Sequence, residues 1–135
     1  MYYMPFEITS NLRKKEYPKK IPYQKIKDHT LGNSYDLSLV FIGDSLSQKL
    51  NREFRAKDKA TDILTFPVSD DMGEIFINLD YAYKKAKTFD RSPQNYIAFL
   101  FVHGLAHILG YDHENEKDAE EMEKFERKIR KKFKI

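Results

Sequence analysis

The sequence contains no cysteine among its 135 residues. Disulfide bonds and thiolate metal ligands are therefore excluded, and any bound metal must be held by His, Asp or Glu side chains. This composition is compatible with a cytosolic compartment, where structural disulfides are rare.

Long hydrophobic segments are missing as well. The longest apolar run, residues 96–109, is interrupted by two histidines and is shorter than the roughly 20 residues needed to cross a bilayer. The N-terminus lacks a basic region followed by a long apolar run and a small-residue cleavage site, which argues against export. We therefore expect a cytoplasmic protein without a membrane anchor, in which the apolar run forms a buried core helix.

Neither sign of charge dominates, because 24 Lys and Arg residues are balanced by 21 Asp and Glu residues, for a net charge of +3. This mild basic bias suits a polyanionic partner without establishing one. The basic residues gather near the two ends of the chain, and the simplest interpretation of each group is a solvated face. The two groups are Arg13, Lys14, Lys15, Lys19, Lys20, Lys25 and Lys27, and then Arg127, Lys128, Arg130, Lys131, Lys132 and Lys134.

Strand-like and helix-like segments alternate along the chain, whose length suits one domain. Segments rich in β-branched and aromatic residues predict strands at residues 1–9, 37–42, 63–66 and 73–77, the third closed by Pro67. Apolar periodicity and composition predict helices at residues 23–31, 45–55, 80–89, 93–109 and 116–133. We expect an α+β fold: a single domain over residues 1–135 with a mixed β-sheet of about four strands, flanked by helices around a central buried helix.

Some of these helices have recognisable start signals. Ser45 with Gln48 resembles a capping box. Ser92 followed by Pro93 is a good N-cap for the central helix. The helix that starts at the capping box is expected to bury one apolar stripe, formed by Leu46, Leu50 and Phe54.

Three of the four histidines lie within eleven residues, at H-x-x-x-H-x-x-G-x-x-H spacing. His103 and His107 are four residues apart in a segment without proline, so on a helix their imidazoles project from the same face. Gly110 follows where a helix can end with a left-handed residue, and His113 can then return toward the other two. Three neutral imidazoles around Zn²⁺ leave a fourth position for water, which is the arrangement of a catalytic zinc site.

The histidines also admit other interpretations. A single histidine on an apolar helix is more often a packed core residue than a ligand, and the fourth, His29, is expected to be an ordinary surface residue. The triple with its glycine favours a metal site. Its spacing is also that of metzincin peptidases, whose H-E-x-x-H motif uses the Glu as general base, but Gly104 stands at that position. Peptide hydrolysis is therefore a minor hypothesis.

Two stretches together resemble the YbeY family of bacterial ribosomal RNA maturation factors. Residues 51–67 are N-R-E-F-R-A-K-D-K-A-T-D-I-L-T-F-P, residues 103–113 are H-G-L-A-H-I-L-G-Y-D-H, and residues 73–75 between them match the family's G-D-I strand. The order and approximate spacing of the elements extend the resemblance over nearly the whole chain. Departures that affect packing and turn geometry are Ala56 in place of Gly, Thr65 in place of Ser, Glu74 in place of Asp and Ala106 in place of Leu.

The resemblance implies a single-strand-specific, metal-dependent endoribonuclease that acts in ribosomal RNA processing, at the 3′ end of the 16S ribosomal RNA, and in ribosome quality control. It implies one zinc ion per chain, or another divalent metal, held by His103, His107 and His113, and a functional role for Arg55. Ribosomal RNA and the small ribosomal subunit are the implied partners, with ribosomal proteins or assembly GTPases as further candidates. Independently of the resemblance, the guanidinium of Arg55 offers a planar fork to a phosphate.

The mechanism stays open at this level between attack by a metal-activated water and attack by the RNA 2′-hydroxyl. In either case Arg55 would stabilise the charge that develops on the phosphate. Asp112 and Glu114 are either residues that orient a histidine or turn residues without a role. Two alternatives are a non-catalytic ribosome-assembly factor that uses zinc as a structural clip, and a zinc peptidase that lacks the usual Glu base.

Overall fold

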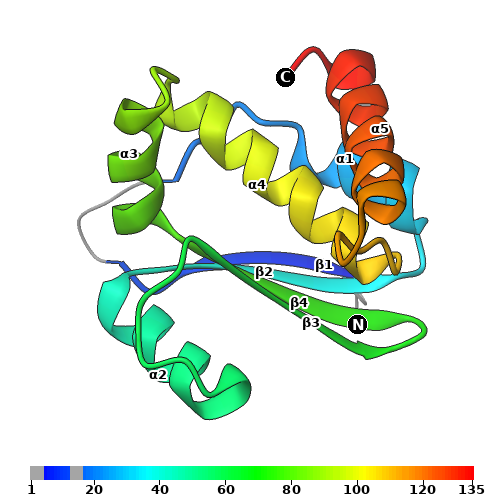
Figure 1. Ribbon diagram of the computed structural model, residues 1–135. Coiled ribbons are helices and arrows are strands. Elements are labelled where there is room, and N and C mark those ends of the chain that lie inside the picture. Colours follow the sequence, from blue (N-terminus) through cyan, green and yellow to red (C-terminus); the bar gives the residue numbers. More distant parts are fainter. Residues whose placement is uncertain (1–4, 13–16) are drawn as a thin grey trace.

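The computed structural model describes residues 5–12 and 17–135 of the chain. Figure 1 shows the elements coloured along the sequence. The strands in these residues are β1 (Phe6–Ser10), β2 (Asp36–Ile42), β3 (Ile63–Ser69) and β4 (Met72–Asn78). The helices are α1 (Tyr23–Leu31), α2 (Asp44–Arg55), α3 (Leu79–Thr88), α4 (Pro93–Ile108) and α5 (Glu116–Phe133).

The strands form one mixed sheet in the order β1-β2-β4-β3. β1, β2 and β4 are parallel to one another, and β3 is antiparallel to β4. The hairpin of β3 and β4 therefore places β3 at one edge of the sheet and leaves β1 at the other. The prediction of an α+β domain with a four-stranded mixed sheet flanked by helices is confirmed.

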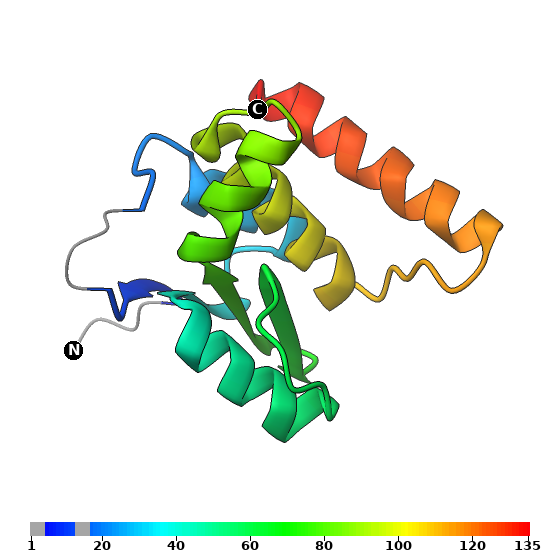
Figure 2. The same ribbon diagram turned by 60° about the vertical axis from the view of Figure 1, so that its left-hand side comes forward.

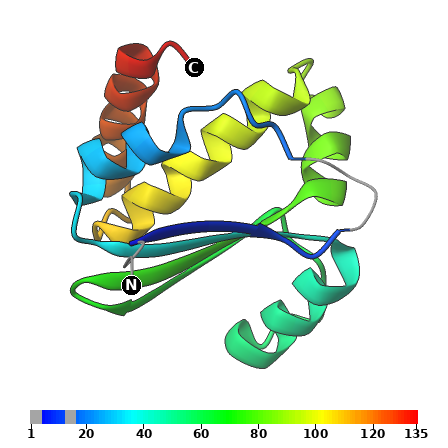
Figure 3. The ribbon, with the colours of Figure 1, turned by 180° about the vertical axis from the view of Figure 1, so that it is seen from behind.

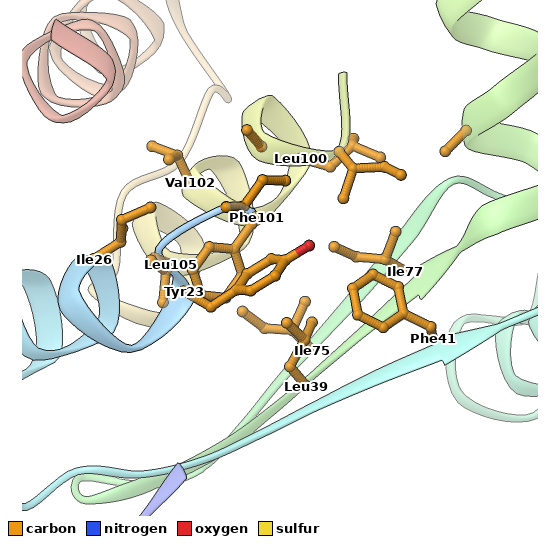
Figure 4. Packing of buried hydrophobic residues seen from close by; sticks show 14 of the residues in the cluster. Tyr23, Ile26, Leu39, Phe41, Ile75, Ile77, Leu100, Phe101, Val102 and Leu105 are labelled. Carbon is orange, nitrogen blue, oxygen red and sulfur yellow. The ribbon is translucent and has the colours of Figure 1, made fainter. Parts of the chain in front are cut away.

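The helices cover the two faces of the sheet unequally. α1, α3, α4 and α5 lie on one side of the sheet, and α2 lies on the other (Figure 1, and from behind in Figure 3). The strand side chains that point toward α4 form the core of the domain (Figure 4). Fully buried among them are Leu37, Leu39, Phe41, Ile75 and Ile77.

α4 is the helix around which the larger helical layer packs. Nine of its sixteen residues are buried, and it contacts α1, α3, α5 and the sheet. Phe101 shows the packing well, because its ring meets the edge of Tyr23 from α1 at a centroid distance of 5.2 Å (Figure 4). A helix that is apolar around most of its circumference belongs inside the fold. Neither α4 nor any other helix in the described part of the chain is long and apolar enough to span a membrane.

The start and the end of α4 follow the sequence signals. The Ser92 side chain accepts a hydrogen bond from the Asn95 N–H at 3.0 Å, and Pro93 occupies the first turn. After the helix ends at Ile108, Gly110 takes a φ of +97°. Both features were predicted, and both arise from residues that are adjacent in the sequence.

The third strand is longer than predicted. β3 continues through Pro67 to Ser69, and β4 already begins at Met72, so only residues 70–71 form the tight turn between the two strands. Proline lacks the N–H that a strand inside a sheet would donate, and for this reason it was expected to close the strand. It is tolerated because β3 is an edge strand that needs partners on one side only.

The start of α2 also differs from the prediction. Its N-cap is Gly43, without a side-chain capping bond, so Ser45 and Gln48 do not form a capping box. The Gln48 side chain instead donates to Asp58 in the loop after the helix, at 3.1 Å. The capping box was predicted from neighbouring residues alone, and in the fold Gln48 makes a hydrogen bond to the loop instead.

The buried face of α2 is polar. Ser47 and Asn51 are the buried residues of this helix, whereas Phe54 is 64% exposed. The predicted apolar stripe of Leu46, Leu50 and Phe54 is therefore not the buried one. The helix instead packs through side-chain hydrogen bonds to the backbone of the loop at residues 56–62.

The basic group near the N-terminus is not uniformly solvated. Lys27 is completely buried, and its Nζ donates to the carbonyl of Asn33 at 3.2 Å and lies 3.4 Å from Asp28. The solvated-face interpretation is wrong for this residue, because its amine ties α1 to the following turn. The remainder of the prediction for this region, namely a strand over residues 1–4 and the charges of Arg13, Lys14 and Lys15, lies outside the described residues.

Candidate active site

His103 and His107 project from the same face of α4, as their spacing predicts. Their Nε2 atoms are 3.2 Å apart, and their ring centroids are 4.6 Å apart with the rings nearly perpendicular. The ring of His113 joins them, at centroid distances of 6.3 Å from His103 and 5.6 Å from His107. The structure therefore brings all three predicted histidines together.

A compact turn after α4 delivers His113. The N–H of Gly110 donates to His107 O at 3.0 Å, and the N–H of Tyr111 donates to Ala106 O, also at 3.0 Å. Tyr111 then stacks on Phe125 of α5 at a centroid distance of 4.7 Å. Figure 2 shows the connection that leads from α4 to α5 after this turn. Ring stacking and backbone hydrogen bonds together fix the turn that precedes His113.

The carboxylate that contacts a histidine ring was not the one considered from the sequence. Asp112 accepts a hydrogen bond from the backbone N–H of His113 at 2.6 Å, and Glu114 is exposed. Glu126 of α5 instead places Oε1 3.1 Å from Nδ1 of His103. The sequence signal for Glu126 is that it interrupts an apolar stripe, and it is in fact buried on the same face of α5 as Met122 and Ile129.

The electrostatic environment favours neutral imidazole at the centre of this group. Burial lowers the pKa of His107 below its ordinary value of 6.5, the neighbouring His103 and His113 lower it further, and Asp112 partly opposes them. A lowered histidine pKa means that the neutral form predominates over a wider pH range. Metal ions bind this neutral form, so the shift is in the direction that a metal site needs.

The residues fit a zinc ion in kind. Zinc bonds to nitrogen of 2.0–2.1 Å place two ligand atoms of a tetrahedron about 3.3 Å apart, and the two Nε2 atoms are 3.2 Å apart. Histidine nitrogen is a preferred zinc donor. Within residues 5–12 and 17–135, no group of three or more His, Asp or Glu side chains is already arranged to hold an ion. His103 and His107 thus have the separation of two zinc ligands. His113 supplies a third donor of the right kind, but the three side chains are not arranged as a complete site.

Arg55 reaches the same site from the other side of the sheet. It is the last residue of α2, its Nη2 donates to the carbonyl of Thr65 at 3.1 Å, and its Cζ lies 5.8 Å from the ring centroid of Phe66. A guanidinium carries five N–H donors, so this bond leaves donors for an anion. Arg55 is therefore held at the edge strand with part of its planar fork free to bind phosphate.

Hydrogen bonds hold the loop between α2 and β3 against α2 and the end of β4. The Ser47 hydroxyl donates to Thr61 O and accepts from Thr61 N–H, both at 2.9 Å. The Asn51 amide donates to Lys59 O at 2.9 Å, and the amide of Asn78 donates to Thr61 O at 3.1 Å. These bonds explain why the buried face of α2 is polar: it satisfies the backbone of the loop that leads into the site.

One open pocket of about 640 Å³ joins these groups. Arg55 and the three histidines all line it, so every predicted site residue faces the same cavity. The pocket also holds Asp62, a residue that the sequence reasoning did not single out although it stands just before β3. The Asp62 carboxylate accepts a hydrogen bond from the Tyr96 hydroxyl at 2.8 Å. Burial and this carboxylate raise the pKa of Tyr96, so its hydroxyl stays protonated as the donor.

Gly104, which stands where the H-E-x-x-H motif has its Glu, packs closely against the sheet. A Cβ at this position would lie 3.0 Å from Ile75 Cδ1 and 3.1 Å from Ile63 Cδ1. A glutamate here would therefore be directed into the packed face of the sheet. The Glu base of an H-E-x-x-H peptidase would therefore require these isoleucine side chains to move, and the alternative of a peptidase without this Glu stays a prediction.

Ala56 allows a direct test of the backbone next to Arg55. This residue ends α2 with a φ of +55°, in the left-handed region that costs L-residues roughly 1–2 kcal/mol. We expect Ala56→Gly to raise the free energy of unfolding by about 1 kcal/mol, because glycine adopts this conformation without strain. Urea denaturation of both proteins measures the difference.

Ala60 provides the matched control for this prediction. It lies in the same loop but is not among the described residues with positive φ. Ala60→Gly is expected to lower stability slightly, by about 0.5–1 kcal/mol, because glycine gains entropy in the unfolded chain. Equal changes at both positions would contradict the backbone argument.

The α+β domain places three imidazoles, a carboxylate and a guanidinium around one open pocket. These groups define a protein that can bind a metal ion and an anion together. The chain belongs to the YbeY family: the family model described as Endoribonuclease YbeY matches residues 7–134.

Individual relatives show how far the similarity extends. A protein from Nautilia profundicola named Endoribonuclease YbeY is 41% identical over 116 residues, which are 82% of each chain. One of the same name from Alkaliphilus metalliredigens is 40% identical over 103 residues, 68% of this chain and 66% of that one. The match to the one from Myxococcus xanthus is 39% identical and spans 70% of this chain but only 35% of the relative.

The fold has a counterpart among solved structures. The solution structure of TM1509 from Thermotoga maritima superimposes with a TM-score of 0.63, covering 96% of this chain and 91% of that chain. At 20% sequence identity this likeness supports the fold alone.

Proposed function

We propose that the protein is a metal-dependent endoribonuclease that cleaves single-stranded RNA. The observation that carries this proposal is the convergence of three imidazoles and Arg55 on one open pocket. The relatives' name, Endoribonuclease YbeY, supports the same reaction class. In this proposal His103, His107 and His113 bind one zinc ion.

The residues of the chain have distinct roles in this reaction. Arg55 binds a phosphate of the RNA through its free donors, and its bond to Thr65 O keeps the guanidinium in position. A preorganised cation of this kind stabilises the charge that develops on the phosphate during cleavage. A zinc ion, when bound, would supply a Lewis acid for that phosphate and lower the pKa of water.

Ribosomal RNA is the proposed substrate, and the family resemblance supports this choice. The proposed roles are ribosomal RNA processing, including the 3′ end of the 16S ribosomal RNA, and ribosome quality control, in the cytoplasm and on the small ribosomal subunit. The exposed basic residues near the end of α5 suit a polyanionic partner of this kind. They are Arg127, Lys128, Lys131, Lys132 and Lys134.

Metal removal tests the proposed function. Chelation of the purified protein is expected to abolish cleavage of a single-stranded RNA, and added Zn²⁺ is expected to restore it. Analysis of the product ends identifies the nucleophile, because attack by the 2′-hydroxyl leaves a cyclic phosphate and attack by water does not. Cleavage that persists in the chelated, metal-free protein would contradict a metal-dependent reaction.

The same samples separate a catalytic from a structural metal. The buried core around α4 consists of apolar residues other than the histidines, so metal removal should lower the melting temperature and leave the domain folded. Circular dichroism measures both properties. A metal-free protein with a random-coil spectrum at room temperature would show instead that the metal is a structural nucleus, as the assembly-factor alternative requires.

A further inference from the structure

We propose that Glu126 is a positioning residue of this metal site: it accepts a hydrogen bond from Nδ1–H of His103 and thereby keeps the Nε2 lone pair of that ring directed into the pocket. This inference rests on the proposed function, because the orientation of the ring matters most when Nε2 is a metal ligand. Its starting point is the 3.1 Å distance between Glu126 Oε1 and His103 Nδ1.

The burial of Glu126 argues that this contact has a role. The residue is only 5% exposed, and it lies on the buried face of α5 with Met122 and Ile129. A carboxylate at such a position costs stability unless it is paired, and an apolar side chain of similar size would avoid that cost. The contacts of the carboxylate therefore explain why an acid stands at this position.

Further side chains hold the carboxylate and the ring together. Arg130, one turn later on α5, places Nη1 3.7 Å from Glu126 Oε2. Its Cζ also lies 5.2 Å from the ring centroid of Phe99, and Phe99 stacks on the ring of His103 with an interplanar angle of 8°. His103 is thus contacted at its Nδ1 edge by Glu126 and on one face by Phe99, which limits rotation of the imidazole.

The position of the proton on the His103 ring determines which of its nitrogens can bind a metal ion. Neutral imidazole carries one N–H, so a proton on Nδ1 leaves Nε2 as the lone-pair nitrogen. That Nε2 lies 3.2 Å from Nε2 of His107, a separation that suits two nitrogen ligands of one zinc ion. Carboxylates that accept from a ligand histidine in this way typically contribute 10–100-fold to metal affinity.

Zinc affinity of a Glu126→Gln variant tests the inference. Glutamine keeps the size of the side chain, but its neutral amide can donate as well as accept, so it no longer selects one tautomer. Competition with a chromophoric chelator at fixed pH should show zinc binding about 10–100-fold weaker than in the unchanged protein. Circular dichroism verifies that the variant is folded.

Glu123→Gln is the matched control. Glu123 lies on the same helix three residues earlier, is exposed, and pairs with Arg127 on the surface. Its replacement is expected to leave zinc affinity unchanged. Equal affinity in the Glu126→Gln, Glu123→Gln and unchanged proteins would overturn the proposal.

A second readout needs neither zinc nor a variant. Nitrogen-15 NMR of the His103 ring in the metal-free protein should show a protonated Nδ1 and an unprotonated Nε2. The opposite tautomer in the unchanged protein would overturn the proposal, whether or not Glu126→Gln folds. If the unchanged protein bound no zinc, the proposed function would fail, and the tautomer would still decide whether Glu126 fixes this ring.

Discussion

His107→Ala is expected to remove tightly bound zinc and to abolish RNA cleavage. His107 provides one of the two Nε2 atoms that already lie at zinc-ligand separation, 3.2 Å apart. Partners that act only through a ligand contribute about 10–100-fold to affinity, so the loss of a ligand itself should exceed about 100-fold. Metal analysis after dialysis against a chelator, together with a cleavage assay on the same sample, measures both effects.

His29→Ala is the matched control for this prediction. His29 is exposed on α1 and contacts Phe133, away from the pocket. Its variant should keep one zinc per chain and full cleavage. A His107→Ala protein that retained stoichiometric zinc under chelator competition would show that the ligand assignment is wrong.

Arg55→Ala is expected to lower the rate of RNA cleavage by roughly 10²–10³, the loss seen when one preorganised donor is removed from an enzyme site. Arg55→Lys should also cleave poorly, because it keeps the charge but loses the planar fork. RNA affinity should fall much less than the rate in both variants, if the guanidinium acts on the transition state. Zinc content should stay normal, since arginine is not a ligand.

The measurement for Arg55 compares single-turnover cleavage with equilibrium binding on one RNA, at fixed salt because phosphate contacts weaken as salt rises. Arg52→Ala is the control, since Arg52 lies one turn earlier on α2 and pairs with Asp58 on the surface. Equal losses of rate and affinity at Arg55 would make it a docking residue only. Unchanged cleavage in Arg55→Ala would remove it from the site.

Features that depend on neighbours in the sequence could be predicted well. The start of α4 at Ser92 and Pro93 and the left-handed Gly110 after it involve residues within one turn of each other. The approach of His103 and His107 also follows from helical geometry alone. The convergence of His113 needed only a short turn after the same helix.

Features that depend on tertiary neighbours could not be predicted. Pro67 was expected to end its strand, and only the strand order shows that it lies at an edge where proline is tolerated. Glu126 lies 23 residues from His103 in the sequence, so nothing local indicates their contact. Lys27 is buried because the carbonyl of Asn33 accepts from its amine, a contact that composition does not reveal.

The exposed Phe54 illustrates the same limit on α2. Its spacing from Leu46 and Leu50 predicted a buried apolar stripe, but the helix turns Ser47 and Asn51 inward. Those polar residues bind the backbone of the loop that carries Asp62 into the pocket. Apolar periodicity carries no information about hydrogen bonds to a loop, and here those bonds determine which face of the helix is buried.

X-ray absorption spectroscopy at the zinc edge tests the central claim most directly. The zinc-loaded protein should show three imidazole nitrogens at about 2.0–2.1 Å, from His103, His107 and His113, with the fourth position taken by an oxygen from water. The His107→Ala protein should lose this signature. A coordination shell with fewer than three imidazoles in the unchanged protein, or the same three-imidazole shell in His107→Ala, would contradict a zinc centre built from these histidines.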